Sequence, residues 1–304
     1  MTKDNILRST HIVGLLTAGS RLTGLLREML MAHFFGTSLA KSAFDVAFRI
    51  PNLFRNLLGE GALSAAFIPV LSESIEREGV EKAHELAGRM MTLLGTVLAG
   101  IVLGGILLVT AAIEFAPLGE RAAAVLPLLR VMLPYAFFIC LVALGMAVLN
   151  SFHRFALAAF TPILMNVTMI LTLILICPWY GVSEMDRIYV AAWGVIGAGA
   201  LQFLCQVPAL AKIGFRPRVS VAWREDERIH RVLERMAPVA LGLGVFQVNV
   251  AMDSLLALVV AGWAAAALNY AQEIVYLPLA LFGTAMGTVL LPTFSRQVVR
   301  NEIP

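Results

Sequence analysis

The sequence has few charged residues for its length. Of its 304 residues 14% are charged, whereas 59% are hydrophobic and the mean hydropathy is +0.83. An ordinary soluble domain has about 45–50% apolar and about 25% charged residues, because polar groups must cover its surface. This scarcity of charge excludes a soluble enzyme, a disordered chain and a nucleic-acid binder, and it predicts a polytopic membrane protein.

Cysteine and histidine are also scarce, which excludes several kinds of site. The three cysteines, Cys140, Cys177 and Cys205, lie in apolar runs and form neither a disulfide framework nor a metal site. The five histidines are scattered over predicted helix ends and loops, so no histidine–acid pair shares one helical face. We therefore predict no catalytic residues and no cofactor, which disfavours an integral-membrane enzyme acting on prenyl lipids.

The apolar runs predict an all-α fold, a polytopic membrane helix bundle. A bilayer-spanning helix takes about 20 residues, and eight such helices are expected at residues 8–35, 42–73, 90–113, 122–150, 156–179, 188–211, 233–261 and 264–295. We divide the chain into a first lobe of six helices over 1–212, a basic cytoplasmic linker over 213–232, and the first two helices of a second lobe over 233–304.

The basic residues between the predicted helices predict the orientation of the chain. With a cytoplasmic N-terminus, fourteen lysines and arginines lie on the cytoplasmic side and three, Lys41, Arg121 and Arg187, on the outer side. Cytoplasmic loops of membrane proteins carry such an excess. This distribution predicts eight membrane crossings with both termini in the cytoplasm.

Polar side chains form stripes along otherwise apolar helices. At about 100° per residue, Arg21, Arg27 and Glu28 fall on one third of the circumference of the first helix. The second helix carries a stripe of Asp45, Arg49, Asn52, Asn56 and Glu60, with Arg55 beside it, and Pro51 is expected to bend this helix. Similar positions recur in the seventh and eighth helices at Asn249, Asp253, Asn269, Gln272, Glu273 and Tyr276.

Two interpretations of these stripes are open. The charges could form buried ion pairs that lock the bundle, such as Arg27 with Glu28 or Arg49 with Asp45. Pairs alone do not explain a polar line along several helices, so we favour a water-filled cavity with a cationic wall. Arginine suits a phosphate or pyrophosphate, because its planar guanidinium donates two parallel hydrogen bonds and stays charged.

An internal repeat supports the cavity. Residues 43–47 (AFDVA) match residues 267–271 (ALNYA) at an offset that also relates Gly59 to Gly283. A six-helix unit therefore begins again near residue 233, and repeated halves with a site at the midplane are typical of transporters.

Several of these segments resemble a known family. The run Ser20–Glu28 (SRLTGLLRE) resembles the first-helix segment of the MurJ/MviN lipid II flippases. Residues 48–55 (FRIPNLFR) and 59–71 (GEGALSAAFIPVL) are similar to that family's second-helix signature. Further similarity at 149–155 (LNSFHRF) and from Gly283 to Pro292 extends the resemblance over the whole chain.

This resemblance implies a membrane transporter of the multidrug/oligosaccharidyl-lipid/polysaccharide exporter superfamily rather than an enzyme. Its substrate would be the undecaprenyl-pyrophosphate-linked peptidoglycan precursor, moved by alternating access across the bacterial inner membrane. By motif match, Arg21, Arg27 and Arg55 are implied to contact the pyrophosphate and sugar headgroup, and Glu60 to belong to the portal region. With the stripe residues, the candidate substrate-binding set is Arg21, Arg27, Arg49, Asn52, Arg55, Glu60 and Glu273.

Coupling and partners follow from the same resemblance. Asp253 falls near a seventh-helix position that resembles a sodium ligand in some members, so a sodium ion or the membrane potential is the expected driving force. The expected partners are the lipid-linked precursor and the bilayer, with no nucleic acid. A complete member has about fourteen helices, so eight imply a fragment or a second polypeptide that carries the rest.

The sequence also departs from the family pattern. The family commonly has an arginine where this chain has Glu273, and usually an aspartate where it has Ser42. Together with Asp253, Glu273 keeps a second hypothesis open, an exporter of the same fold for drugs or for another polyprenyl-linked glycan. An inactive fragment is the remaining alternative.

Overall fold

The computed structural model describes residues 3–180, 183–217, 219–220 and 222–276, with side chains from residue 11 onward except those of 58–60. Within these residues the secondary structure is helical and no strand occurs. The elements in order are α1 (Lys3–Phe35), α2 (Leu39–Phe54), η1 (Arg55–Ala62), α3 (Leu63–Glu78), α4 (Val80–Phe115), α5 (Glu120–Met132), α6 (Pro134–Ser151), α7 (Phe155–Leu171), η2 (Thr172–Ile176), η3 (Cys177–Trp179), α8 (Glu184–Lys212), η4 (Ala222–Glu225) and α9 (Glu227–Val260). A further helix covers residues 264–276.

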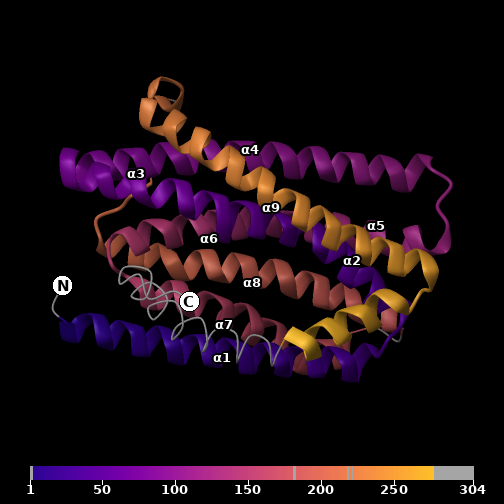
Figure 1. Cartoon of the computed structure of the whole chain (residues 1–304). Helices are drawn as coiled ribbons and strands as arrows, with labels where there is room; N and C mark the ends of the chain where they lie inside the picture. Colours follow the sequence, from indigo (N-terminus) through magenta and orange to yellow (C-terminus); the bar gives the residue numbers. More distant parts are fainter. Residues whose placement is uncertain (1–2, 181–182, 218, 221, 277–304) are drawn as a thin grey trace, which may run out of the picture.

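The helices run along one another as a bundle. Figure 1 shows α1 beside α7 at one side and α3 and α4 at the other, with α9 running obliquely across the bundle. The main helix pairs are α1 with α7, α6 with α8, and α2 with α5, while α9 packs on η1, α3 and α2. Since α1 touches α2 only slightly, the space between them is left for the polar stripes.

The apolar faces of these helices meet in one continuous core. Its largest fully buried side chains include Phe67, Leu86, Leu128 and Met132, which come from α3, α4 and α5. Large apolar side chains such as Leu107 and Leu108 of α4 are instead more than 70% exposed. A surface this apolar fits a lipid environment rather than water.

Five helical stretches are long and apolar enough to cross a membrane: Val80–Phe115, Pro134–Ser151, Phe155–Trp179, Glu184–Lys212 and Glu227–Val260. These correspond to the third to seventh expected helices. The first expected helix is α1, and the second is the continuous run of α2, η1 and α3, both of which carry the polar stripes. The eighth begins at residue 264 as expected, but residues 277–304 lie outside the described residues.

The second helix changes its hydrogen-bond pattern at its centre. Pro51 lies inside α2, and the π-helical segment η1 starts one turn later at Arg55. Proline has no N–H to donate, and π segments are common where a helix adjusts at a functional site. The irregularity expected at Pro51 is therefore a local widening that begins where Arg55 faces the cavity described below.

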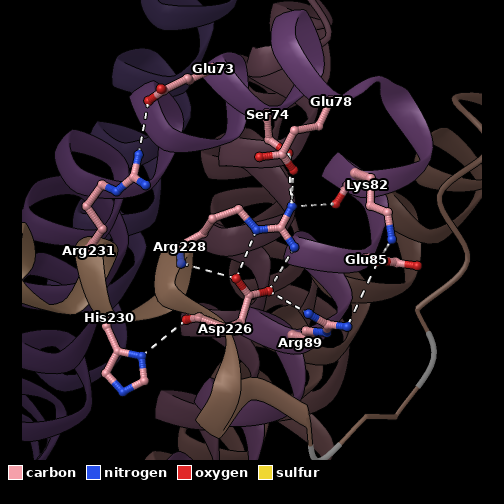
Figure 2. Close-up of polar contacts among 10 residues, drawn as sticks. All are labelled: Glu73, Ser74, Glu78, Lys82, Glu85, Arg89, Asp226, Arg228, His230 and Arg231. Carbon is pink, nitrogen blue, oxygen red and sulfur yellow. Dashed lines mark hydrogen bonds and ion pairs between the residues drawn. The ribbon is translucent and has the colours of Figure 1, made fainter.

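The seventh expected helix is α9, which begins at Glu227 and not at residue 233. A cluster of ion pairs fixes its start. Arg228 binds Asp226 through two nitrogens, Nε to Oδ1 at 2.9 Å and Nη2 to Oδ2 at 2.9 Å. Arg89 of α4 adds a bond from Nη1 to Asp226 Oδ2 at 2.7 Å, and Arg228 also contacts Glu78 of α3 (Figure 2). The basic residues at this end thus bind the bundle's own acids.

The cluster holds Asp226 in its ionised form. Its side chain is 4% exposed and also caps α9 by accepting a hydrogen bond from the Arg228 N–H at 3.1 Å. Burial alone would raise the pKa of this carboxyl, but the hydrogen bonds from Arg228 and Arg89 lower it to about 2. Asp226 therefore stabilises the folded state above the usual carboxyl pKa of 3.8, and this stabilisation is lost as the pH falls through about 2.

We expect Asp226→Asn to lower the free energy of unfolding by about 1–3 kcal/mol, because two arginines lose a charged acceptor. The measurement is thermal unfolding of the purified chain in detergent from neutral to acidic pH. The difference from wild type is expected to be constant down to about pH 3.8 and to shrink towards pH 2.

The matched control is Glu85→Gln, which removes an exposed acid that pairs with Lys82 at the same end. Exposed pairs contribute at most about 1 kcal/mol. An Asp226→Asn variant as stable as Glu85→Gln, or a difference that grows at low pH, would contradict the role of the cluster.

Candidate functional site

A cavity of about 680 Å³ lies between α1, α2, α6, α7, α8 and the helix over 264–276. Its volume is in the range of small-molecule sites, about 300–1,000 Å³. One part of the wall is apolar, with Phe44, Phe48, Met165 and Met169. The polar and charged side chains on the wall include Arg21, Arg27, Glu28, Asp45, Arg49, Asn52, Arg55, Asn166, Asn269 and Glu273.

The structure brings most of the candidate substrate-binding residues to this one wall. Six of the seven line the cavity: Arg21, Arg27, Arg49, Asn52, Arg55 and Glu273. The side chain of Glu60, the seventh, lies outside the described residues. What these residues bind stays a prediction, but their convergence from three helices is the arrangement that a binding site requires.

Arg27 is held on the wall by two side-chain hydrogen bonds. Its Nη2 donates to Glu28 Oε1 at 2.7 Å and its Nη1 to Asn166 Oδ1 at 3.0 Å. Asn166 lies on α7, and its own Nδ2 donates to the Ser20 carbonyl at 3.0 Å. A guanidinium has five N–H donors, so these two bonds orient Arg27 and leave further donors toward the cavity.

Asn166 packs against the backbone of α1 at Gly24. A Cβ at Gly24 would lie 3.4 Å from Asn166 Nδ2. Asn166 was not among the site residues predicted from the sequence. Its sequence context does indicate a polar contact, because a buried amide in an apolar helix needs a hydrogen-bond partner.

Lys41 is a second residue whose environment the sequence did not reveal. Which side of the membrane this end faces stays a prediction, but Lys41 was also expected to lie between the first two helices. Instead α2 begins at Leu39, and Lys41 is 1% exposed in its first turn. Its Nζ lies 2.5 Å from Asp45 Oδ1 and 3.7 Å from Glu28 Oε2. The sequence does indicate the pair with Asp45, because a lysine four residues before an aspartate lies next to it on a helix.

The expected ion pairs are partly present. Arg27 binds Glu28, as the paired interpretation proposed. Arg49 does not bind Asp45: its Nε donates to Ser254 Oγ at 3.2 Å and its Nη2 to Gln272 Oε1 at 3.1 Å. Asp45 instead pairs with Lys41, one turn earlier on α2. Ion pairs and a cavity therefore coexist.

The eighth helix is anchored beside these charges. Ser42 is fully buried and accepts a hydrogen bond from the Ala266 N–H at 3.1 Å. This bond satisfies one of the free N–H groups in the first turn of the helix over 264–276. Tyr270 donates to the Gly36 carbonyl at 3.0 Å. These contacts hold Glu273 at the cavity.

Glu273 lines the cavity with no hydrogen bond or ion pair to any other described residue. Among the described lining residues four arginines face three acids, Glu28, Asp45 and Glu273. Two of these acids are already in ion pairs with Arg27 and Lys41. The wall therefore offers guanidinium donors to an anion, with one carboxylate among them.

The structure adds no metal site to this wall. Over the described residues no group of three histidine, cysteine, aspartate or glutamate side chains could hold a metal ion. Asp253 is exposed on α9 and does not line the cavity, although its neighbour Ser254 is buried and binds Arg49. Sodium binding at Asp253 stays a prediction.

Membrane-length helices beside a polar cavity, in a chain with repeated segments, are the architecture that membrane transporters share. Within that class the chain belongs to the lipid II flippase MurJ family, whose sequence profile matches residues 31–304. A lipid II flippase MurJ of Burkholderia cenocepacia is 36% identical over 300 residues, which cover 96% of this chain and 57% of that protein. A probable lipid II flippase MurJ of Vibrio cholerae is 35% identical, over 97% of this chain and 57% of that protein.

Solved structures share the fold. The structure described as lipid II flippase MurJ, inward closed conformation, superimposes with a TM-score of 0.75 at 24% identity, covering 93% of this chain and 58% of that one. A transporter of the MOP superfamily from Pyrococcus furiosus gives a TM-score of 0.62 at 14% identity, covering 89% and 60%. The chain thus spans a little under three fifths of the length of the relatives it matches.

We expect Asn166→Leu to reduce the free energy of unfolding by about 1–3 kcal/mol, because Arg27 and the Ser20 carbonyl each lose a buried partner. The leucine keeps the branching of the amide but neither donates nor accepts a hydrogen bond. Thermal unfolding of the purified chain is the measurement.

Thr168→Val is the matched control on the same helix, because the Thr168 hydroxyl donates only to its own helix, at the Leu164 carbonyl. Equal losses for the two variants would mean that Asn166 does not link α1 to α7 through Arg27.

Proposed function

We propose that this chain is a flippase of the bacterial inner membrane for a lipid-linked peptidoglycan precursor. Its headgroup would enter the cavity while the polyprenyl tail stays in the bilayer. Four arginines from α1, α2 and η1 face one cavity, and Arg27 is held there by Glu28 and Asn166. That convergence carries the proposal, because guanidinium groups match the oxygen geometry of a pyrophosphate.

Translocation would require no covalent step. The pyrophosphate binds the arginines in one state, the helices rearrange, and the lipid leaves on the other side. A ligand drives such a change only through its different affinity for the two states. The names of the relatives, lipid II flippase and probable lipid II flippase, support the same substrate.

We also propose that both termini are cytoplasmic. The basic cluster of Arg89, Arg228 and Arg231 would then lie at the cytoplasmic end of the bundle. An excess of lysine and arginine on that side is the usual distribution.

An exporter for cationic compounds is the second candidate, and one observation favours it. Glu273 faces the cavity without an ion-pair partner among the described residues, so it could attract a cation. The other two acids of the wall are neutralised by Arg27 and Lys41. The remaining charge of the wall is therefore positive, which favours an anion.

We expect the chain in lipid nanodiscs to bind undecaprenyl pyrophosphate in preference to a cationic dye. Arg27→Ala is expected to weaken that binding by about 10- to 100-fold, since a hydrogen bond to a charged group contributes about 1.5–3 kcal/mol. Native mass spectrometry or a fluorescence titration measures both ligands.

Arg130→Ala is the control, because Arg130 is exposed and does not line the cavity. Preference for the dye would favour the exporter. Undiminished binding of undecaprenyl pyrophosphate by Arg27→Ala would rule out the role of Arg27.

A further inference from the structure

Lys41 is a buried cation directly behind the cavity wall. It is 1% exposed and does not itself line the cavity, whereas its two carboxylate neighbours, Glu28 and Asp45, do. Its ammonium also lies over the Tyr270 ring, 4.8 Å from the ring centroid. Burying a lysine is costly unless the charge is paired, and the two acids that pair with Lys41 both line the cavity.

The fold fixes Lys41 at this place. Ser38 caps α2 and accepts a hydrogen bond from the Lys41 backbone N–H at 3.3 Å. One turn later on the same helix comes Asp45, and Glu28 approaches from α1. Lys41 therefore joins two carboxylates that belong to different helices.

Each of these carboxylates also has an arginine within reach. Glu28 is bound by Arg27, with Nη2 to Oε1 at 2.7 Å. Asp45 precedes Arg49 by four residues on α2, a spacing at which side chains pair readily. Arg49 nevertheless donates to Ser254 and Gln272, while Lys41 takes Asp45. The lysine thus competes with the cavity arginines for the same acids.

Removing Lys41 would change this competition. Glu28 and Asp45 would share the wall with Glu273, and no ammonium would balance them from behind. Arg27 already binds Glu28 and would donate to it further, and Arg49, one turn from Asp45, would turn toward that carboxylate. An anion in the cavity would lose hydrogen-bond donors, although every arginine is still present.

We propose that Lys41 is a positioning residue for anion binding: from behind the wall it neutralises Asp45 and shares Glu28 with Arg27, and so keeps the remaining Arg27 and Arg49 donors available to a pyrophosphate. The inference rests on the proposed function, because it concerns the headgroup bound at that same site. Lys41 touches no ligand itself and acts through the charge balance of the wall.

The test compares an anionic and an uncharged lipid that share one tail. Undecaprenyl pyrophosphate and undecaprenol are titrated against the chain in nanodiscs. Lys41→Met is expected to weaken binding of the pyrophosphate by about tenfold or more, an effect of about 1.4 kcal/mol. Binding of undecaprenol is expected to stay unchanged, whereas a merely structural defect would weaken both.

A double variant, Lys41→Met with Asp45→Asn, removes one charge of each sign. It is expected to fold and to recover affinity for the pyrophosphate to within about threefold of wild type, well under 1.4 kcal/mol. Lys82→Met is the control, since Lys82 is an exposed lysine that pairs with Glu85 far from the cavity wall. Thermal unfolding of every variant accompanies the titrations.

Three results would overturn the inference: unchanged pyrophosphate binding in Lys41→Met, equal weakening for both lipids, or a double variant that fails to fold or to recover. If Lys41→Met itself does not fold, the double variant decides. A wild-type chain that binds both lipids equally would contradict the proposed function. A wild type that prefers the pyrophosphate, with Arg27→Ala impaired and Lys41→Met intact, would contradict this inference alone.

Discussion

A charged side chain inside a membrane bundle needs a charged partner or a polar cavity, and this protein supplies both at one place. Arg27, Glu28, Lys41 and Asp45 form a chain of contacts that crosses from α1 to α2. Charges in the bilayer centre cost on the order of 2.5–3.5 kcal/mol each on insertion scales. Pairing offsets that cost, and the cavity lets the remaining arginine donors face water or a ligand.

The packing of the helices follows from this arrangement. Asn166 links α7 to α1 through Arg27. The Ser42 hydroxyl accepts a hydrogen bond from the Ala266 N–H, in the first turn of the helix over 264–276. Arg49 reaches the same helix at Gln272 and α9 at Ser254. Polar contacts thus determine which helices border the cavity, and the apolar core around Phe67 and Leu128 fills the rest of the bundle. At the end of the bundle where α9 begins, Asp226 makes a second polar junction with Arg89 and Arg228.

The sequence predicts most of the residues that line the cavity, because a helix has a fixed period. Spacing of about 3.6 residues per turn places Arg21 and Arg27 on one face of α1, and the structure puts both on the cavity wall. Periodicity does not reveal which residue on another helix a side chain meets. The burial of Lys41 was not predicted because a lysine beside a turn is typical of an exposed helix end. Asn166 was not predicted as a site residue because a single amide forms no stripe. The partner of Asp45 depends on how α2 is rotated against its neighbours, which only the packed bundle defines.

The most direct test of the account is an experimental structure of this chain in nanodiscs with undecaprenyl pyrophosphate bound. The account predicts pyrophosphate density within hydrogen-bond distance of the Arg27 guanidinium, with the Arg27–Glu28 and Lys41–Asp45 pairs retained. Density for the pyrophosphate outside the cavity, or an Arg49 guanidinium paired with Asp45 in place of Lys41, would contradict it.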